Sequence, residues 1–132
     1  MENIRVMIVD DSTFSIAVLK RMLQKEGLEI VGTALNMNEA IQKAQELKPD
    51  LITMDMTLPD GDGIECSKEI LKHLKDTKII AISAMMDEEI IQRAKKVGIK
   101  TYLQKPVDQT DLDAAIERLF EGDELYGILK NN

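Results

Sequence analysis

Residues 4–11 read Ile-Arg-Val-Met-Ile-Val-Asp-Asp, a short and nearly unbroken apolar run that ends in two adjacent carboxylates. Apolar side chains at consecutive positions predict a strand that is covered on both faces, as in parallel sheets. Residues 13–26 then place apolar side chains at helical spacing, and Gly27 stands where a glycine commonly ends a helix. The start of the chain therefore indicates a buried strand, an acidic pair and a helix, in that order.

The same alternation of strand and helix recurs four more times along the chain. Further strands are expected at residues 29–34, 51–55, 78–83 and 101–104. Further helices are expected at residues 39–48 and 64–75, after a cap at Asp87, and after a cap at Asp108. Residues 57–63 contain one proline and two glycines and are expected to form an irregular loop. This order predicts an α/β fold, a parallel sheet with helices on both faces.

Composition narrows the class of protein further. A chain of 132 residues with 44% hydrophobic and 31% charged residues has the size and balance of one compact domain. Cys66 is the only cysteine, which excludes an internal disulfide and a cysteine-based zinc site. The net charge of −7 disfavours nucleic-acid binding by this chain alone. No apolar run approaches a membrane span and the chain begins directly in a strand pattern, so we expect a cytoplasmic protein without a signal peptide.

The domain is expected to occupy residues 1–122. Residues 123–132 are predicted to be a C-terminal tail or the start of a linker. Their four large apolar side chains are too few to form an independent unit; they are Leu125, Tyr126, Ile128 and Leu129.

Side chains suited to chemistry follow four of the five predicted strands. They are Asp10 and Asp11, Asp55, Ser83, and Lys105. Because parallel strands end at a common edge, where ligands of such sheets bind, we expect these side chains to converge. Two carboxylates about 4 Å apart repel by roughly 4 kcal/mol at an effective dielectric of about 20. A hard divalent cation such as Mg²⁺ relieves this repulsion and accepts oxygen ligands.

The convergence favours phosphoryl transfer, which requires mainly positioning and neutralisation of charge. Asp55 follows the middle strand and is the candidate nucleophile, forming an aspartyl phosphate. Lys105 is expected to pair with a phosphoryl oxygen, and the Ser83 hydroxyl to hydrogen-bond to it.

These motifs resemble the response-regulator receiver family, of which CheY-like chemotaxis proteins are the minimal form. The matching stretches are residues 9–12 (Val-Asp-Asp-Ser), residues 54–63, Ser83-Ala84 and Lys105-Pro106. Together they place the resemblance over residues 4–121. It implies a flavodoxin-like five-stranded sheet with strand order 2-1-3-4-5.

The resemblance also implies a role for each site residue. Asp11 would ligate Mg²⁺ directly, with Mn²⁺ as the alternative ion, and Asp10 would assist. Asp55 would be both metal ligand and phosphoacceptor, and the backbone carbonyl of Thr57 would complete the protein ligands. Ser83 and Tyr102 would be switch residues. The peptide bond before Pro106 would be cis.

The function implied is a phosphorylation-dependent switch of a two-component system, which is not an enzyme although it catalyses its own phosphorylation and dephosphorylation. A sensor histidine kinase would be the phosphodonor and a phosphatase a further partner. A downstream protein would dock on the face of the fourth helix, fifth strand and fifth helix, helped by Lys95, Lys96 and Lys100. We expect a monomer or weak dimer, either free-standing or cut from a longer regulator.

Three other classes of protein compete with this interpretation. A metal-dependent aspartyl phosphatase or phosphotransferase of the haloacid-dehalogenase type, acting on an outside substrate, needs a second Asp where Ser12 stands. A flavodoxin-like cofactor binder needs a phosphate loop rich in Ser, Thr and Gly, whereas the first loop here is acidic. A pseudo-receiver would lack site residues that this chain has.

Overall fold

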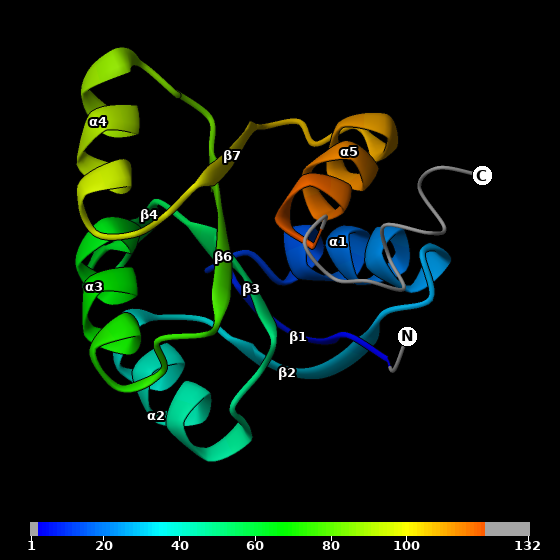
Figure 1. Ribbon diagram of the computed structural model, residues 1–132, viewed down its shortest axis with the longest axis horizontal. Coiled ribbons are helices and arrows are strands. Elements are labelled where there is room, and N and C mark those ends of the chain that lie inside the picture. The colour runs from blue at the N-terminus through cyan, green and yellow to red at the C-terminus, as the bar shows by residue number, and fades with distance from the viewer. Residues whose placement is uncertain (1–2, 121–132) are drawn as a thin grey trace.

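The computed structural model describes residues 3–120 as a five-stranded parallel sheet between two layers of helices (Figure 1). The strands run in the spatial order β2-β1-β3-β6-β7, which is the predicted order 2-1-3-4-5 of the five sheet strands. Their bounds are β1 (Arg5–Val9), β2 (Glu29–Ala34), β3 (Leu51–Asp55), β6 (Lys78–Ser83) and β7 (Thr101–Gln104). The fold class and strand order predicted from the sequence are confirmed.

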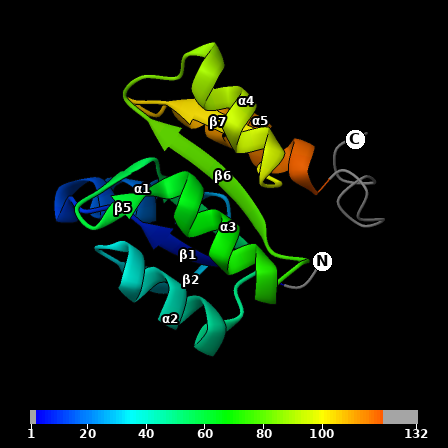
Figure 2. The same cartoon turned by 90° about the vertical axis from the view of Figure 1, so that its left-hand side faces the viewer.

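Helices cover both faces of the sheet, as its parallel strands require. Their bounds are α1 (Thr13–Lys25), α2 (Met37–Leu47), α3 (Gly63–His73), α4 (Glu88–Lys96) and α5 (Gln109–Leu119). Helices α1 and α5 lie on one face, and α2, α3 and α4 lie on the other (Figures 1 and 2). Because the five strands are parallel, their carboxyl ends all lie at one edge of the sheet, and the site forms at that edge.

Strand β3 lies at the centre of two apolar layers. Its residues alternate between the layers, so that Leu51 packs with the α1–α5 cluster while Ile52 and Met54 pack with the α2–α3–α4 cluster. All five of its residues are buried. Burial of a large aliphatic side chain contributes about 1.5–3 kcal/mol, so this strand anchors Asp55 firmly at its carboxyl end.

Each helix begins at a polar side chain that accepts a hydrogen bond from a backbone N–H of the first turn. The caps are Ser12, Asn36, Asp62, Asp87 and Asp108. The predicted caps at Asp87 and Asp108 are confirmed. Three helices differ from prediction at their ends: α1 ends at Lys25 instead of residue 26, α2 begins at Met37 because Asn36 caps it and ends at Leu47, and α3 begins at Gly63 and ends at His73.

The prediction of an irregular loop at residues 57–63 is wrong in part. Thr57–Leu58 (β4) and Gly61–Asp62 (β5) form a two-residue antiparallel ladder, because the chain reverses at Pro59 and Asp60. The Asp60 carboxylate also accepts hydrogen bonds from the N–H groups of Met37 (2.7 Å) and Asn38 (3.1 Å). These bonds lower the pKa of Asp60 below its ordinary 3.8 and fix the hairpin to the start of α2.

The predicted tail at residues 123–132, and the boundary placed at residue 122, lie outside the described residues. Among residues 3–120, no helix is long and apolar enough to cross a membrane.

Replacing Gly63 by Ala tests how tightly the loop is held behind Asp55. A Cβ at this position would clash with the backbone oxygen of Asp55 and would lie 2.8 Å from the Cα of Met56. Since backbone must shift to admit it, Gly63→Ala is expected to lower the free energy of unfolding by about 1–3 kcal/mol in urea denaturation. Lys68→Ala on the exposed side of α3 is the control. Equal stability of the two variants would contradict this packing.

Candidate functional site

The structure brings four charged side chains together at the carboxyl edge of the sheet. Asp10 and Asp11 follow β1, Asp55 ends β3, and Lys105 follows β7. Each of the three carboxylates offers an oxygen that lies within 4.8 Å of the others. The sequence predicted this convergence because all of these residues stand at or just beyond strand ends.

Lys105 links the two buried carboxylates. Its Nζ donates to Asp10 Oδ2 at 3.1 Å and to Asp55 Oδ2 at 3.2 Å. Asp10 and Asp55 are 1% and 6% exposed, whereas Asp11 is exposed. The lysine therefore balances part of the negative charge while one face of the cluster remains open to solvent.

Backbone N–H groups orient the same two carboxylates. Ser12 N–H donates to Asp10 Oδ1 at 2.9 Å, and Thr57 N–H donates to Asp55 Oδ1 at 3.0 Å. In each case the donor lies two residues beyond the Asp, so the turn that follows the strand holds the side chain. One oxygen of each carboxylate thus faces its own loop while the other faces Lys105.

Burial dominates the electrostatics of Asp55. It raises the pKa of Asp55 above its ordinary 3.8, although the Thr57 N–H and Lys105 lower it in part. Burial also lowers the pKa of Lys105, but the hydrogen bonds to Asp10 and Asp55 outweigh it, and the net pKa is raised above 10.5. The hydrogen bonds therefore stabilise the charged form of Lys105. Burial, by contrast, destabilises the charged form of Asp55 more than its contacts stabilise it.

Ser83 is near the site, but its hydroxyl serves its own loop. The hydroxyl donates to the carbonyl of Met85 at 2.9 Å and accepts from the Met85 N–H at 3.2 Å. The backbone carbonyl of Ser83 accepts a hydrogen bond from the Lys105 N–H at 2.8 Å, which holds the ends of β6 and β7 together. The Lys105–Pro106 bond is cis, as the resemblance implied.

Tyr102 and Thr57 occupy different surroundings. Tyr102, on β7, is half-buried against the α2–α3–α4 cluster and lines a cavity of about 390 Å³ between α4, β7 and α5. Thr57 is exposed in β4, and its N–H is already used by Asp55. Tyr102 therefore lies away from the acidic cluster, on the face predicted for partners.

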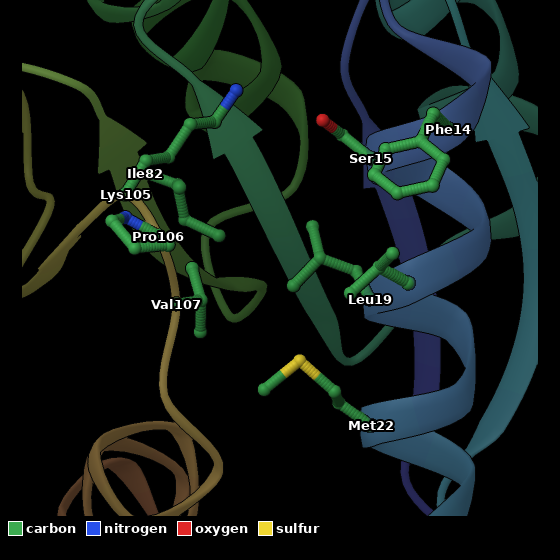
Figure 3. Close-up of a pocket in the computed structure, with 9 residues that line it drawn as sticks. Phe14, Ser15, Leu19, Met22, Ile82, Lys105, Pro106 and Val107 are labelled. Carbon is green, nitrogen blue, oxygen red and sulfur yellow. The ribbon is translucent and has the colours of Figure 1, made fainter.

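A second cavity adjoins the charged cluster and was not predicted. It measures about 370 Å³ and lies between α1 and the segment after β7. Figure 3 shows Phe14, Ser15, Leu19 and Met22 on one side and Ile82, Lys105, Pro106 and Val107 on the other. Phe14 is 77% exposed. The sequence contained a signal for this cavity, because Phe14 lies outside the row of apolar side chains that α1 buries.

Comparison with known proteins identifies relatives of the whole domain. The sequence model of the family described as "Response regulator receiver domain" matches residues 6–117. The chemotaxis protein CheY of Thermotoga maritima is 41% identical over 115 residues, which are 87% of this chain and 96% of that protein. The response regulator protein VraR of Staphylococcus epidermidis is 33% identical over 93% of this chain but only 59% of its own length.

A solved structure agrees with the sequence relatives. A chain of the CheX–CheY–BeF3–Mg complex from Borrelia burgdorferi has a TM-score of 0.85 and 33% identity, with 88% of each chain covered. The likeness therefore extends over most of the molecule rather than over the motifs alone.

Asp55→Asn is expected to raise the free energy of unfolding in metal-free buffer at pH 7. The raised pKa means that the folded state holds the Asp55 proton more tightly than the unfolded state, so its ionised form destabilises the fold. The gain should be largest above the folded pKa and should vanish as the pH falls through it toward 3.8. Urea denaturation at several pH values measures it. A gain that stayed constant down to pH 3 would exclude this origin.

Proposed function

Because this chain belongs to the response regulator receiver domain family and is CheY-like, we propose that it is a signalling switch thrown by phosphorylation of Asp55. The observation that carries the proposal is the pair of contacts from Lys105 to Asp10 and Asp55 beside the open oxygen of Asp11. This arrangement leaves room for a cation on one side of Asp55 and supplies a fixed positive charge on the other.

The donor set fits Mg²⁺, with Mn²⁺ as the alternative. All three clustered ligands are carboxylate oxygens, and a partly open site suits an ion that retains waters. Asp10, Asp11, Asp55 and the backbone carbonyl of Thr57 would hold it. When bound, the ion would neutralise charge on the carboxylates and on the transferring phosphoryl group.

The residues of the chain perform the remaining chemistry. An Asp55 carboxylate oxygen attacks the phosphorus of a phosphohistidine, the P–N bond breaks, and the imidazole leaves with the bonding electrons. Lys105 then exchanges its contact with Asp55 for one with a phosphoryl oxygen. The relative from Borrelia burgdorferi, whose complex contains BeF3 and Mg, supports this assignment. Water attack on the same phosphorus returns the free carboxylate.

Ser83 and Tyr102 would convert the modification into a change of surface. The phosphoryl group adds about two negative charges and three acceptor oxygens, and the Ser83 hydroxyl must leave Met85 to reach them. That movement shifts the loop between β6 and α4, next to the cavity that Tyr102 lines. A ligand shifts a two-state equilibrium by its differential contacts, which the phosphoryl group provides here.

The partners follow from this surface. A sensor histidine kinase would supply the phosphoryl group in the cytoplasm, approaching over the apolar cavity beside Lys105 where Phe14 is exposed. A downstream protein would dock on the α4–β7–α5 face, where exposed Lys95, Lys96 and Lys100 favour an acidic partner. A phosphatase would act on the same aspartyl phosphate.

Acetyl phosphate with Mg²⁺ is expected to label the wild-type chain and to leave Asp55→Asn unlabelled, since the substitution removes the nucleophile. Intact-protein mass spectrometry measures the added phosphoryl group. Asp62→Asn is the matched control, because Asp62 lies in the adjoining hairpin outside the cluster. Labelling of Asp55→Asn at the wild-type level would refute the proposed function.

Reversing the charge of Lys95 and Lys96 tests the docking face. Lys95→Glu/Lys96→Glu should reduce retention of the partner by the phosphorylated chain by about tenfold or more, through lost charge complementarity. Labelling at Asp55 should be unchanged, because neither residue belongs to the acidic cluster. Lys20→Glu/Lys25→Glu on the exposed side of α1 makes the same change in net charge. Equal retention by both double variants would show that the partner docks elsewhere.

A further inference from the structure

A cavity of about 890 Å³ lies at the end of the sheet opposite Asp55. Its walls come from the amino ends of β6 and β7 and the carboxyl ends of α3, α4 and α5; they include Lys78 and Thr101, Leu71, Val97 and Leu119. Strand β6 separates Lys78 from Ser83 by five residues, or roughly 17 Å. The cavity is therefore distinct from the acidic cluster, whereas Thr101 and Arg118 also line the cavity beside Tyr102.

Positive charge is concentrated in this cavity although the chain as a whole is acidic. Lys75, Lys78, Lys100 and Arg118 line it, and Asp76 is the only carboxylate among the lining residues. Within residues 3–120, none of the four cations takes part in an ion pair. Lys78 lies over the ring of Phe120 at 5.2 Å, a cation–π contact that adds no negative charge to the cavity.

The ends of the three helices account for only part of this charge. Each helix carboxyl terminus carries about half a negative charge, so the three termini and Asp76 together supply roughly −2.5 against four cations. If the cations only offset the helix ends and Asp76, about 2.5 positive charges would be enough. The cavity retains an excess of positive charge that a bound anion would balance.

The remaining walls are apolar and the size suits a small molecule. Leu71, Ile79, Val97 and Leu119 form them, and pockets for small ligands measure about 300–1,000 Å³. From the charge and these walls, we propose that the cavity binds an organic phosphate, with two or more negative charges on a body that contacts the aliphatic side chains. The proposal goes beyond the switch function and does not depend on it.

The test titrates the full chain, in EDTA, with three probes: adenosine 5′-diphosphate, inorganic pyrophosphate and adenosine. Adenosine 5′-diphosphate should bind most tightly by calorimetry, pyrophosphate more weakly, and adenosine not at all. Amide NMR shifts should centre on Ile79, Gly98 and Thr101. EDTA removes any cation from the acidic cluster. The cluster then repels the two phosphate probes and makes no charge interaction with neutral adenosine.

Paired variants locate the site. Lys75→Ala/Lys78→Ala should weaken binding of adenosine 5′-diphosphate by about tenfold or more, since both lysines line the cavity. Lys20→Ala/Lys25→Ala removes the same charge from the exposed side of α1, outside the cavity, and should change the affinity by less than about threefold. Acetyl phosphate labelling of Asp55 should be normal in both, which also shows that both are folded.

Three outcomes would overturn the proposal. The first is no binding of either phosphate probe, and the second is equal loss of affinity in both double variants. The third concerns residues 121–124, which contain three carboxylates directly after α5. If adenosine 5′-diphosphate binds only to Glu121→Gln/Asp123→Asn/Glu124→Gln, the occupant is the chain's own acidic segment rather than a small molecule.

Discussion

The bridge that Lys105 makes to Asp10 and Asp55 is the interaction on which the site depends. It joins the end of an outer strand to the ends of two central strands, across sequence separations of 95 and 50 residues. Without it, two nearly buried carboxylates would face each other with backbone N–H groups as their only compensation. The raised pKa of Asp55 shows that compensation is already incomplete. Under the proposed function, a cation or a phosphoryl group that arrived at this site would therefore change its charge balance strongly.

The surroundings of Asp55 divide into rigid and adjustable parts. Strand β3 is buried throughout, and Gly63 packs against the backbone oxygen of Asp55 so closely that a methyl group would clash. The β4–β5 hairpin is further tied to α2 by Asp60 and to α4 by the contact of Asp62 with Arg93 at 3.3 Å. The Ser83 hydroxyl, by contrast, makes hydrogen bonds only with Met85 among the described residues. Under the proposed function, motion that followed phosphorylation would therefore pass through the β6–α4 loop rather than through strand β3, which holds Asp55.

The sequence was sufficient for the parts of the molecule that carry local signals. Unbroken apolar runs marked the strands, and polar residues at their ends marked Asp10, Asp11, Asp55 and Lys105 as neighbours. The strand order came from the resemblance, because periodicity does not specify which strands pair. The caps at Asp87 and Asp108 were predictable for the same local reason as the strands.

Other features were missed because they depend on contacts between distant segments. Asp60 appeared to be an ordinary turn residue, yet it caps a helix that begins 23 residues earlier in the chain. The β4–β5 ladder is too short to produce an alternating pattern. The basic cavity is assembled from five elements, and each of its lysines taken singly resembles a solvated surface residue. Such sites emerge only when the fold places their members together.

The most direct test of the central claim is to locate the phosphoryl group. The chain is treated with acetyl phosphate and Mg²⁺, the acyl phosphate is reduced with borohydride, and the modified residue is identified by tandem mass spectrometry. A first hydride attacks the acyl carbon and phosphate leaves, which gives the aldehyde; a second hydride and a proton from water reduce the aldehyde, so the acceptor aspartate becomes homoserine. We predict homoserine at position 55 alone. Homoserine at position 10 or 11, or a phosphoryl group that resists reduction, would contradict it.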